Sequence, residues 1–154
     1  MSGGAVTFGR FTLERRLAAP PARVFAAFAD PAVKARWFAG PAGEWRQRER
    51  SCDFREGGRE RLVGDWNSGL VTEFDAVYLD IVPDIRIVYG YGMRLDGRRI
   101  SMSLATLEFR AESGGTRFVL TEQGAFLDGY EDGGRREHGT QALIAAMAGV
   151  VEER

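Results

Sequence analysis

The chain has little cysteine and little histidine, and both scarcities limit its chemistry. Cys52 is its single cysteine, so no disulfide can form within the chain, which suits a reducing compartment such as the cytoplasm. His138 is its single histidine, and neither a His-x-x-x-His pair nor a cysteine cluster is present. We therefore expect no metal site, no cofactor and no catalytic set for acyl transfer.

The chain also lacks a charge of one sign and any long apolar run. Its 21 basic and 22 acidic residues give a net charge of -1, and the two signs are interspersed. Such a surface does not attract nucleic acid or an anionic membrane. The glycine pairs do not follow phosphate-loop spacing. No apolar stretch approaches the roughly 18 residues of a membrane span, and the N-terminus has no signal pattern. A cytoplasmic protein is expected.

What the sequence does contain is typical of one globular domain. Its 154 residues, 44% of them hydrophobic, are enough to bury a substantial core, and there is no internal repeat or linker. We expect a single domain over residues 1–154. The order of its patterns is a strand, two short helices, a run of strands and a helix, which indicates an α+β fold.

Proline and aspartate mark the elements near the N-terminus. A strand is predicted over 7–18, with Phe11, Leu13 and Leu17 on one face. Proline fits the first turn of a helix, so the pair at positions 20 and 21 ends this strand and starts a helix over 22–29. Asp30 and the proline after it then end that helix and cap a second short one.

Period-two alternation predicts the strands that follow, at 50–55, 59–63, 70–82, 85–95, 100–110 and 116–124. Within 70–82, the apolar residues Val77, Leu79 and Ile81 alternate with Tyr78 and Asp80. Within 85–95, one apolar face holds Ile85, Ile87, Tyr89, Tyr91 and Met93. The apolar phase changes within 100–110, which indicates a bulge near Ala105.

A glycine- and acid-rich loop is expected over 125–134, followed by a long helix over 135–152. The apolar stripe of this helix consists of Leu143, Ile144, Met147, Val150 and Val151. The stripe requires an apolar surface, which the inner face of the sheet supplies. A curved sheet cannot touch one helix along its whole length, so a pocket is expected between them.

Four segments resemble a known family. They are PPARVFAAFADPAVKARWFAGP at 20–41, DFREGG at 53–58, VYLDIVPDIRIVYGY at 77–91 and GGTRFVLTEQG at 114–124. In this order they resemble the heat-shock-protein ATPase activator homologues of the START-like (SRPBCC) superfamily. The resemblance implies a helix-grip fold, in which a curved antiparallel sheet of about six or seven strands surrounds a long C-terminal helix and encloses a cavity. Family members often carry Gly-Trp at the start of that helix, where this chain has Gly139-Thr140.

Polar residues on the inner face are the candidates for chemistry. Tyr89 and Tyr91 would place hydroxyl groups in an apolar interior, where they bind either a ligand or each other and water. Period two also directs Glu122 inward, where Arg15 on the neighbouring first strand could pair with it. Without such a partner, a raised pKa would make Glu122 a general acid or base. Trp37 either gates the cavity or plugs one end of the core.

These residues leave three hypotheses of function open. The first is a small-molecule binder, whose cavity holds a largely apolar ligand and is lined by Trp37, Phe54, Tyr89, Tyr91, Phe118, Glu122 and Met147. The second is a module that contacts a chaperone, which the resemblance implies, although the sequence shows no strong apolar or charged patch for it. The third is an enzyme of the cyclase or hydratase type. A binder that is not an enzyme, acting as a monomer or homodimer, is the first expectation.

Overall fold

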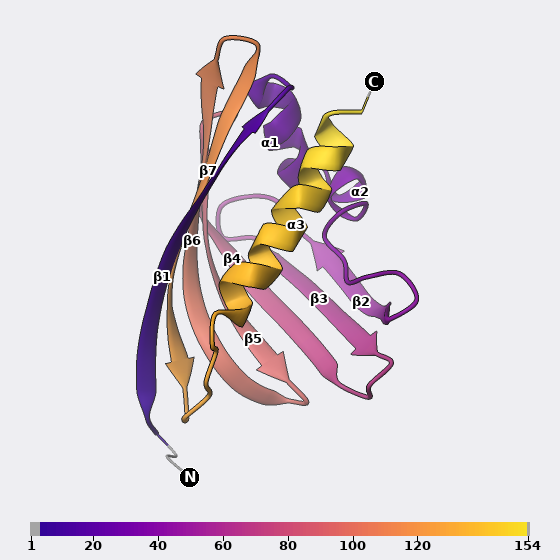
Figure 1. Ribbon diagram of the computed structural model, residues 1–154, viewed down its shortest axis with the longest axis vertical. Helices are drawn as coiled ribbons and strands as arrows, with labels where there is room; N and C mark the ends of the chain where they lie inside the picture. The colour runs from indigo at the N-terminus through magenta and orange to yellow at the C-terminus, as the bar shows by residue number, and fades with distance from the viewer. Residues whose placement is uncertain (1–3, 154) are drawn as a thin grey trace.

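The computed structural model describes residues 4–153 as one curved sheet with three helices (Figure 1). Its elements in chain order are β1 (Val6–Leu17), α1 (Pro21–Ala29), α2 (Pro31–Lys34), β2 (Trp45–Cys52), β3 (Arg59–Trp66), β4 (Val71–Val82), β5 (Arg86–Leu95), β6 (Arg98–Glu112), β7 (Gly115–Leu127) and α3 (Arg135–Val151). This is the α+β helix-grip architecture that the sequence predicts.

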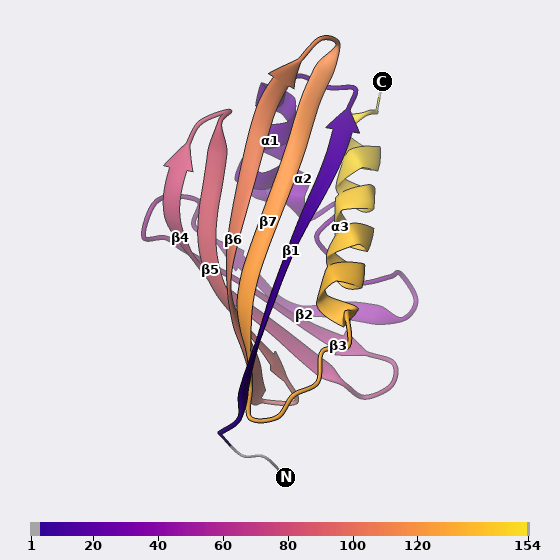
Figure 2. The same cartoon turned by 60° about the vertical axis from the view of Figure 1, so that its left-hand side comes forward.

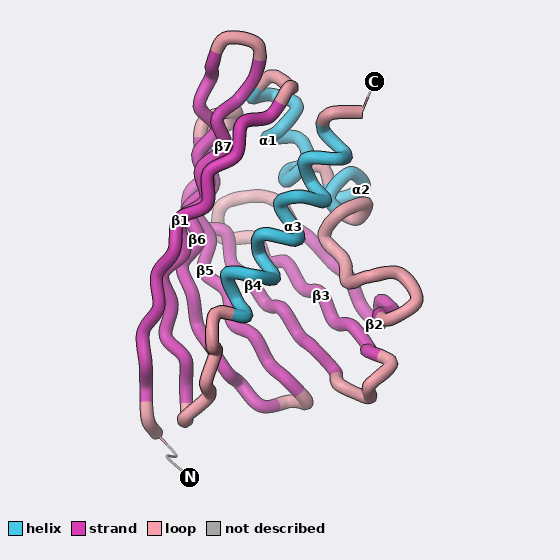
Figure 3. Tube along the Cα trace, viewed as in Figure 1, coloured by secondary structure: helices cyan, strands magenta, loops and turns pink. Residues whose placement is uncertain are grey.

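The seven strands form one antiparallel sheet in the order β1-β7-β6-β5-β4-β3-β2. The first strand therefore pairs with the last, and every other neighbour in the sheet is a neighbour in the chain. The sheet curves, and α3 crosses its concave side (Figure 3). In Figure 2 the helix stands beside β1, and it packs mainly against β1 and α1.

Helix starts follow the predicted proline and aspartate signals. Pro21 occupies the first turn of α1, where its missing N–H costs nothing. The side chain of Asp30 accepts a hydrogen bond from the backbone N–H of Ala32 at 3.0 Å and so caps α2. These two helices close one end of the sheet, where Phe28 of α1 stacks on Phe118 of β7 with ring centroids 5.5 Å apart.

The predicted bulge near Ala105 is wrong. Strand β6 pairs with β7 in unbroken register, and the register shift against β5, between Met93 and Arg94, leaves Ile100 of β6 without a partner there. Ser101, Ser103 and Ala105 point inward with Leu107, and the apolar Met102 and Leu104 point outward with 44% and 37% of their surface exposed. The phase change in the sequence comes from small polar residues inside, because the interior there holds a polar network.

Other details also differ from the predictions, among them β2, which covers Trp45–Cys52 in place of 50–55. The buried residues of β4 are Phe74, Ala76 and Tyr78, and Leu79 is 53% exposed on the outer face. Ile85 belongs to the turn before β5 and is 56% exposed, so only the rest of that predicted face lines the interior. Strand β7 continues to Leu127, three residues into the predicted loop. Within residues 4–153, no helix combines the length and the hydropathy that a membrane span requires.

Candidate functional site

The concave face is not covered evenly. The inward-facing side chains of β6 and β7 are buried, and Leu107 and Phe118 have no exposed surface. Over β2 to β5, inward-facing apolar side chains pack against the core yet stay only partly buried, among them Phe38, Phe54, Leu62, Tyr89 and Met93. Since α3 packs mainly on the β1 side, this part of the sheet keeps apolar surface in contact with solvent.

Aromatic rings make up much of this surface. Phe74 packs edge-on against Phe38 with centroids 5.0 Å apart, and lies 5.0 Å from Tyr91. Phe54 packs edge-on against Tyr78 at 4.9 Å. Such rings present large rigid apolar areas, and edge-to-face pairs hold one another in place.

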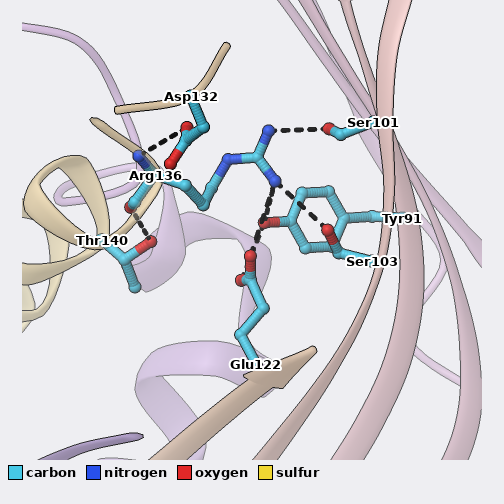
Figure 4. A network of polar contacts seen from close by, with 7 residues as sticks. All are labelled: Tyr91, Ser101, Ser103, Glu122, Asp132, Arg136 and Thr140. Atoms are coloured by element: carbon cyan, nitrogen blue, oxygen red, sulfur yellow. Dashed lines mark hydrogen bonds and ion pairs between the residues drawn. The ribbon is translucent and has the colours of Figure 1, made fainter. Parts of the chain in front are cut away.

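A polar network lies where α3 begins (Figure 4). Asp132 accepts a hydrogen bond from the backbone N–H of Arg136 at 3.0 Å and thereby fixes the start of the helix. The guanidinium of Arg136 then reaches the sheet, where it donates to Ser101 at 2.7 Å, Ser103 at 3.2 Å and the Tyr91 hydroxyl at 3.1 Å. It also lies 3.5 Å from Glu122 Oε2, and Tyr91 donates to Glu122 Oε1 at 2.8 Å.

Burial governs the titration of this network. It raises the pKa of Glu122, while the hydrogen bond from Tyr91 and the charge of Arg136 oppose that rise. Burial also raises the pKa of Tyr91, so its phenol keeps its proton. Glu122 therefore has two partners in this network, Tyr91 and Arg136.

A second buried ion pair lies at the end of the sheet near α2. Lys34, 5% exposed, donates to Glu60 Oε1 on β3 at 2.6 Å, and its ammonium also lies 4.7 Å from the centre of the Phe38 ring. Tyr78 donates to the same oxygen of Glu60. The Cys52 sulfur lies 3.9 Å from the Tyr78 hydroxyl, and burial raises the pKa of the thiol, which makes it a poor nucleophile.

The other candidate residues lie at different depths. Trp37 is 5% exposed and donates through Nε1 to the Ala27 carbonyl at 3.0 Å, while Phe118 and Met147 are fully buried. Phe54 and Tyr89 are partly accessible, and Tyr91 and Glu122 belong to the network of Arg136. Arg15 does not pair with Glu122, because it lies opposite Phe118 and is exposed. His138 is exposed on α3.

Sequence patterns alone did not indicate the two cations. Lys34 and Arg136 lie on helices, and only the fold brings them to Glu60 and Glu122 on the strands. One signal was present for the second pair: the serines at 101 and 103 occupy inward positions of an otherwise apolar strand, and buried hydroxyl groups require a partner. Among residues 4–153, no group of three or more side chains could hold a metal ion.

The curved sheet, the C-terminal helix on its concave side and the partly open apolar face define a START-like helix-grip domain. Residues 18–152 match the family described as "Activator of Hsp90 ATPase homolog 1-like protein". The chain belongs to this family. No curated protein matches it.

Solved structures of similar proteins agree with this assignment. A putative uncharacterized protein from Rhizobium leguminosarum is 45% identical with a TM-score of 0.92, over 97% of this chain and 98% of the other. Mll3558 from Rhizobium loti is 42% identical with a TM-score of 0.87, over 95% of this chain and 99% of the other. CalU16 from Micromonospora echinospora shares the fold at 20% identity and a TM-score of 0.67, over 97% of this chain and 86% of the other.

Proposed function

We propose that this protein binds a small, largely apolar molecule between the sheet and α3. The observation that carries the proposal is the row of inward-facing apolar side chains on β3 to β5 that remain partly exposed, Leu62, Tyr89 and Met93 among them. Side chains that point into a core are normally sealed by the layer opposite. Apolar surface left in contact with water within a concave face is what an apolar ligand would cover.

A ligand would be held here mainly by burial of apolar surface. The two ion pairs at the ends of this face supply no free charge, because Glu60 is paired with Lys34 and Glu122 with Arg136. The pKa values of Tyr91 and Glu122 are raised mainly by burial, and the two side chains are hydrogen-bonded to each other. Both side chains are thus engaged with protein partners, and this arrangement favours a binder over the cyclase or hydratase alternative.

Filling this space should abolish much of the binding. We expect Met93→Trp on the concave face of β5 to weaken binding of the neutral fluorescent probe N-phenyl-1-naphthylamine by about tenfold or more. The added indole would displace two or more ligand methylene groups at about 0.8 kcal/mol each. Fluorescence titration measures the affinity.

Met102→Trp is the matched control, since Met102 is 44% exposed on the outer face of β6 and should leave the affinity unchanged. If the wild-type protein does not bind the probe, or if both tryptophan variants bind it like wild type, the concave face is not a ligand site.

An apolar cluster on the outer face supports a second candidate, contact with a chaperone ATPase of the kind that the family description names. Phe8, Met102 and Leu104 line one shallow depression over β1, β7 and β6, and Phe8 is 83% exposed. Arg10 and Gln123 border it. An apolar centre with a polar border is typical of protein interfaces.

For this candidate, Phe8→Ser combined with Leu104→Ser should weaken binding to an Hsp90-type chaperone by about tenfold or more, because central apolar residues dominate interface affinity. Calorimetry and the chaperone's ATPase rate measure the effect. Ile85→Ser, at a 56% exposed turn position outside the cluster, is the control. Lack of any stimulation by the wild-type protein would exclude this candidate.

A further inference from the structure

Three tyrosines lie in a row on the concave face. Tyr78 of β4 is the register partner of Tyr89 on β5, with ring centroids 5.9 Å apart, and Tyr91 lies 5.8 Å further along. The two outer hydroxyls are occupied, since Tyr78 donates to Glu60 and Tyr91 donates to Glu122. The hydroxyl of Tyr89 makes no hydrogen bond to any residue of the described range 4–153.

The Tyr89 hydroxyl is also not sealed. No side-chain nitrogen or oxygen atom within the described part of the chain is both buried and without a partner, so this hydroxyl reaches solvent. Its ring is surrounded by inward-facing rings, namely those of Tyr78, Tyr91 and Phe74. The accessible part of Tyr89 therefore opens on the space in front of the sheet, and not on the outer face.

A second polar atom of this face is open in the same way. Glu60 is 3% exposed, and Lys34 and Tyr78 both bind its Oε1 atom. Its Oε2 atom has no hydrogen bond in residues 4–153. Since no unpaired side-chain oxygen in this range is fully buried, Oε2 is in contact with solvent as well.

Tyr89 is a hydrogen-bond donor toward this space. Burial and the nearby Tyr91, Glu122 and Glu60 all raise its pKa well above the usual range of a phenol, so the hydroxyl keeps its proton. Water can take that hydrogen bond when the face is empty. A ligand that displaces the water without an acceptor of its own would leave the hydroxyl unsatisfied in an apolar site.

We infer that the ligand carries a hydroxyl or carbonyl oxygen on an uncharged apolar body, and that the Tyr89 hydroxyl donates a hydrogen bond to this oxygen. The inference rests on the proposed binding function and names the ligand class for the same site. The ligand is uncharged because both buried carboxylates of the face already have a cation. Arg50 at the β2 edge has no carboxylate partner within the described residues, and it binds the Phe38 carbonyl at 2.6 Å and Gln47 at 2.8 Å.

The test compares two probes of equal heavy-atom number, 2-acetylnaphthalene and 2-isopropylnaphthalene, by calorimetry. Tyr89→Phe removes one oxygen and should weaken binding of the acetyl compound about 3- to 10-fold, the range for one neutral hydrogen bond. The isopropyl compound, which has no acceptor, should change by less than about twofold. The quantity compared is the ratio of the dissociation constants of the two probes, in Tyr89→Phe relative to wild type. The different hydration of the two probes cancels in this comparison.

Tyr130→Phe, a tyrosine in the segment between β7 and α3, is the control and should alter neither affinity. Equal effects of Tyr89→Phe on both probes would overturn the inference and leave the binding site standing. Tighter binding of 2-naphthoate than of the acetyl compound would also overturn it, because Arg50 and not Tyr89 would then orient the ligand. If the wild-type protein binds none of the probes, the proposed function itself is wrong.

Discussion

Replacing Lys34 by methionine is expected to lower the free energy of unfolding by about 3 to 5 kcal/mol. Lys34 and Glu60 are 5% and 3% exposed, and their charged atoms lie 2.6 Å apart. Removal of the ammonium leaves Glu60 in the interior with the Tyr78 hydroxyl alone on its Oε1 atom. A buried carboxylate that has lost its cation costs free energy. Urea denaturation measures the change.

The double variant Lys34→Met with Glu60→Leu should recover most of this loss, since an apolar pair of similar volume is tolerated where a single buried charge is not. Arg36→Met is the matched control. Arg36 pairs with Glu153 at 2.7 Å, but both side chains are more than half exposed, so its loss should leave the free energy of unfolding nearly unchanged. A loss below about 1 kcal/mol for Lys34→Met would mean that water takes the place of the ammonium on Glu60 Oε1.

Most of the fold could be predicted because its signals are local. Proline at position 21 and the Asp30 cap fix two helix starts, and alternation of apolar residues fixes the strands. The main exception, in β6, has a clear physical cause. Where the inner face of the sheet carries polar side chains, as at Ser101 and Ser103, the apolar residues of the strand face outward. Met102 and Leu104 therefore look like core residues in the sequence although they lie on the outer face. Alternation identifies a strand but cannot by itself say which face is inside.

The site was predictable only in part for a related reason. Period two places Tyr89, Tyr91 and Glu122 on the inner face, and the structure agrees. Which cation meets Glu122 depends on how α3 crosses the sheet, and no local pattern encodes that crossing. The sequence suggests Arg15 as that partner, and the structure places Arg136 of the helix there instead. The depth of each apolar residue depends on the same crossing, because α3 packs mainly on the β1 side.

Replacing Arg136 by leucine is expected to destabilise the protein by about 3 to 5 kcal/mol at pH 7. Its guanidinium binds Ser101, Ser103 and the Tyr91 hydroxyl and lies 3.5 Å from Glu122. All of these partners lie on the sheet, so the side chain joins α3 to three strands at once (Figure 4). Without it, three hydroxyl groups and one carboxylate of the interior lose a donor. Arg135→Leu, at the exposed neighbouring position, should change stability by less than about 0.5 kcal/mol.

The pH dependence distinguishes a lost charge from lost packing. The pKa of Glu122 in the folded protein already lies above its usual value because of burial, and Arg136 partly opposes that rise, so Arg136→Leu should raise it further. When the pKa of a carboxyl group is higher in the folded than in the unfolded protein, the group lowers the free energy of unfolding only at higher pH. The loss is absent below the pKa of the unfolded state and complete above the pKa of the folded state. The deficit of Arg136→Leu should therefore shrink as the pH falls from 7 toward the ordinary carboxyl range. Adding Glu122→Gln should remove this pH dependence, because no group remains there to titrate. If urea denaturation gives the same deficit at both ends of this range, the uncompensated charge of Glu122 is not what destabilises the variant.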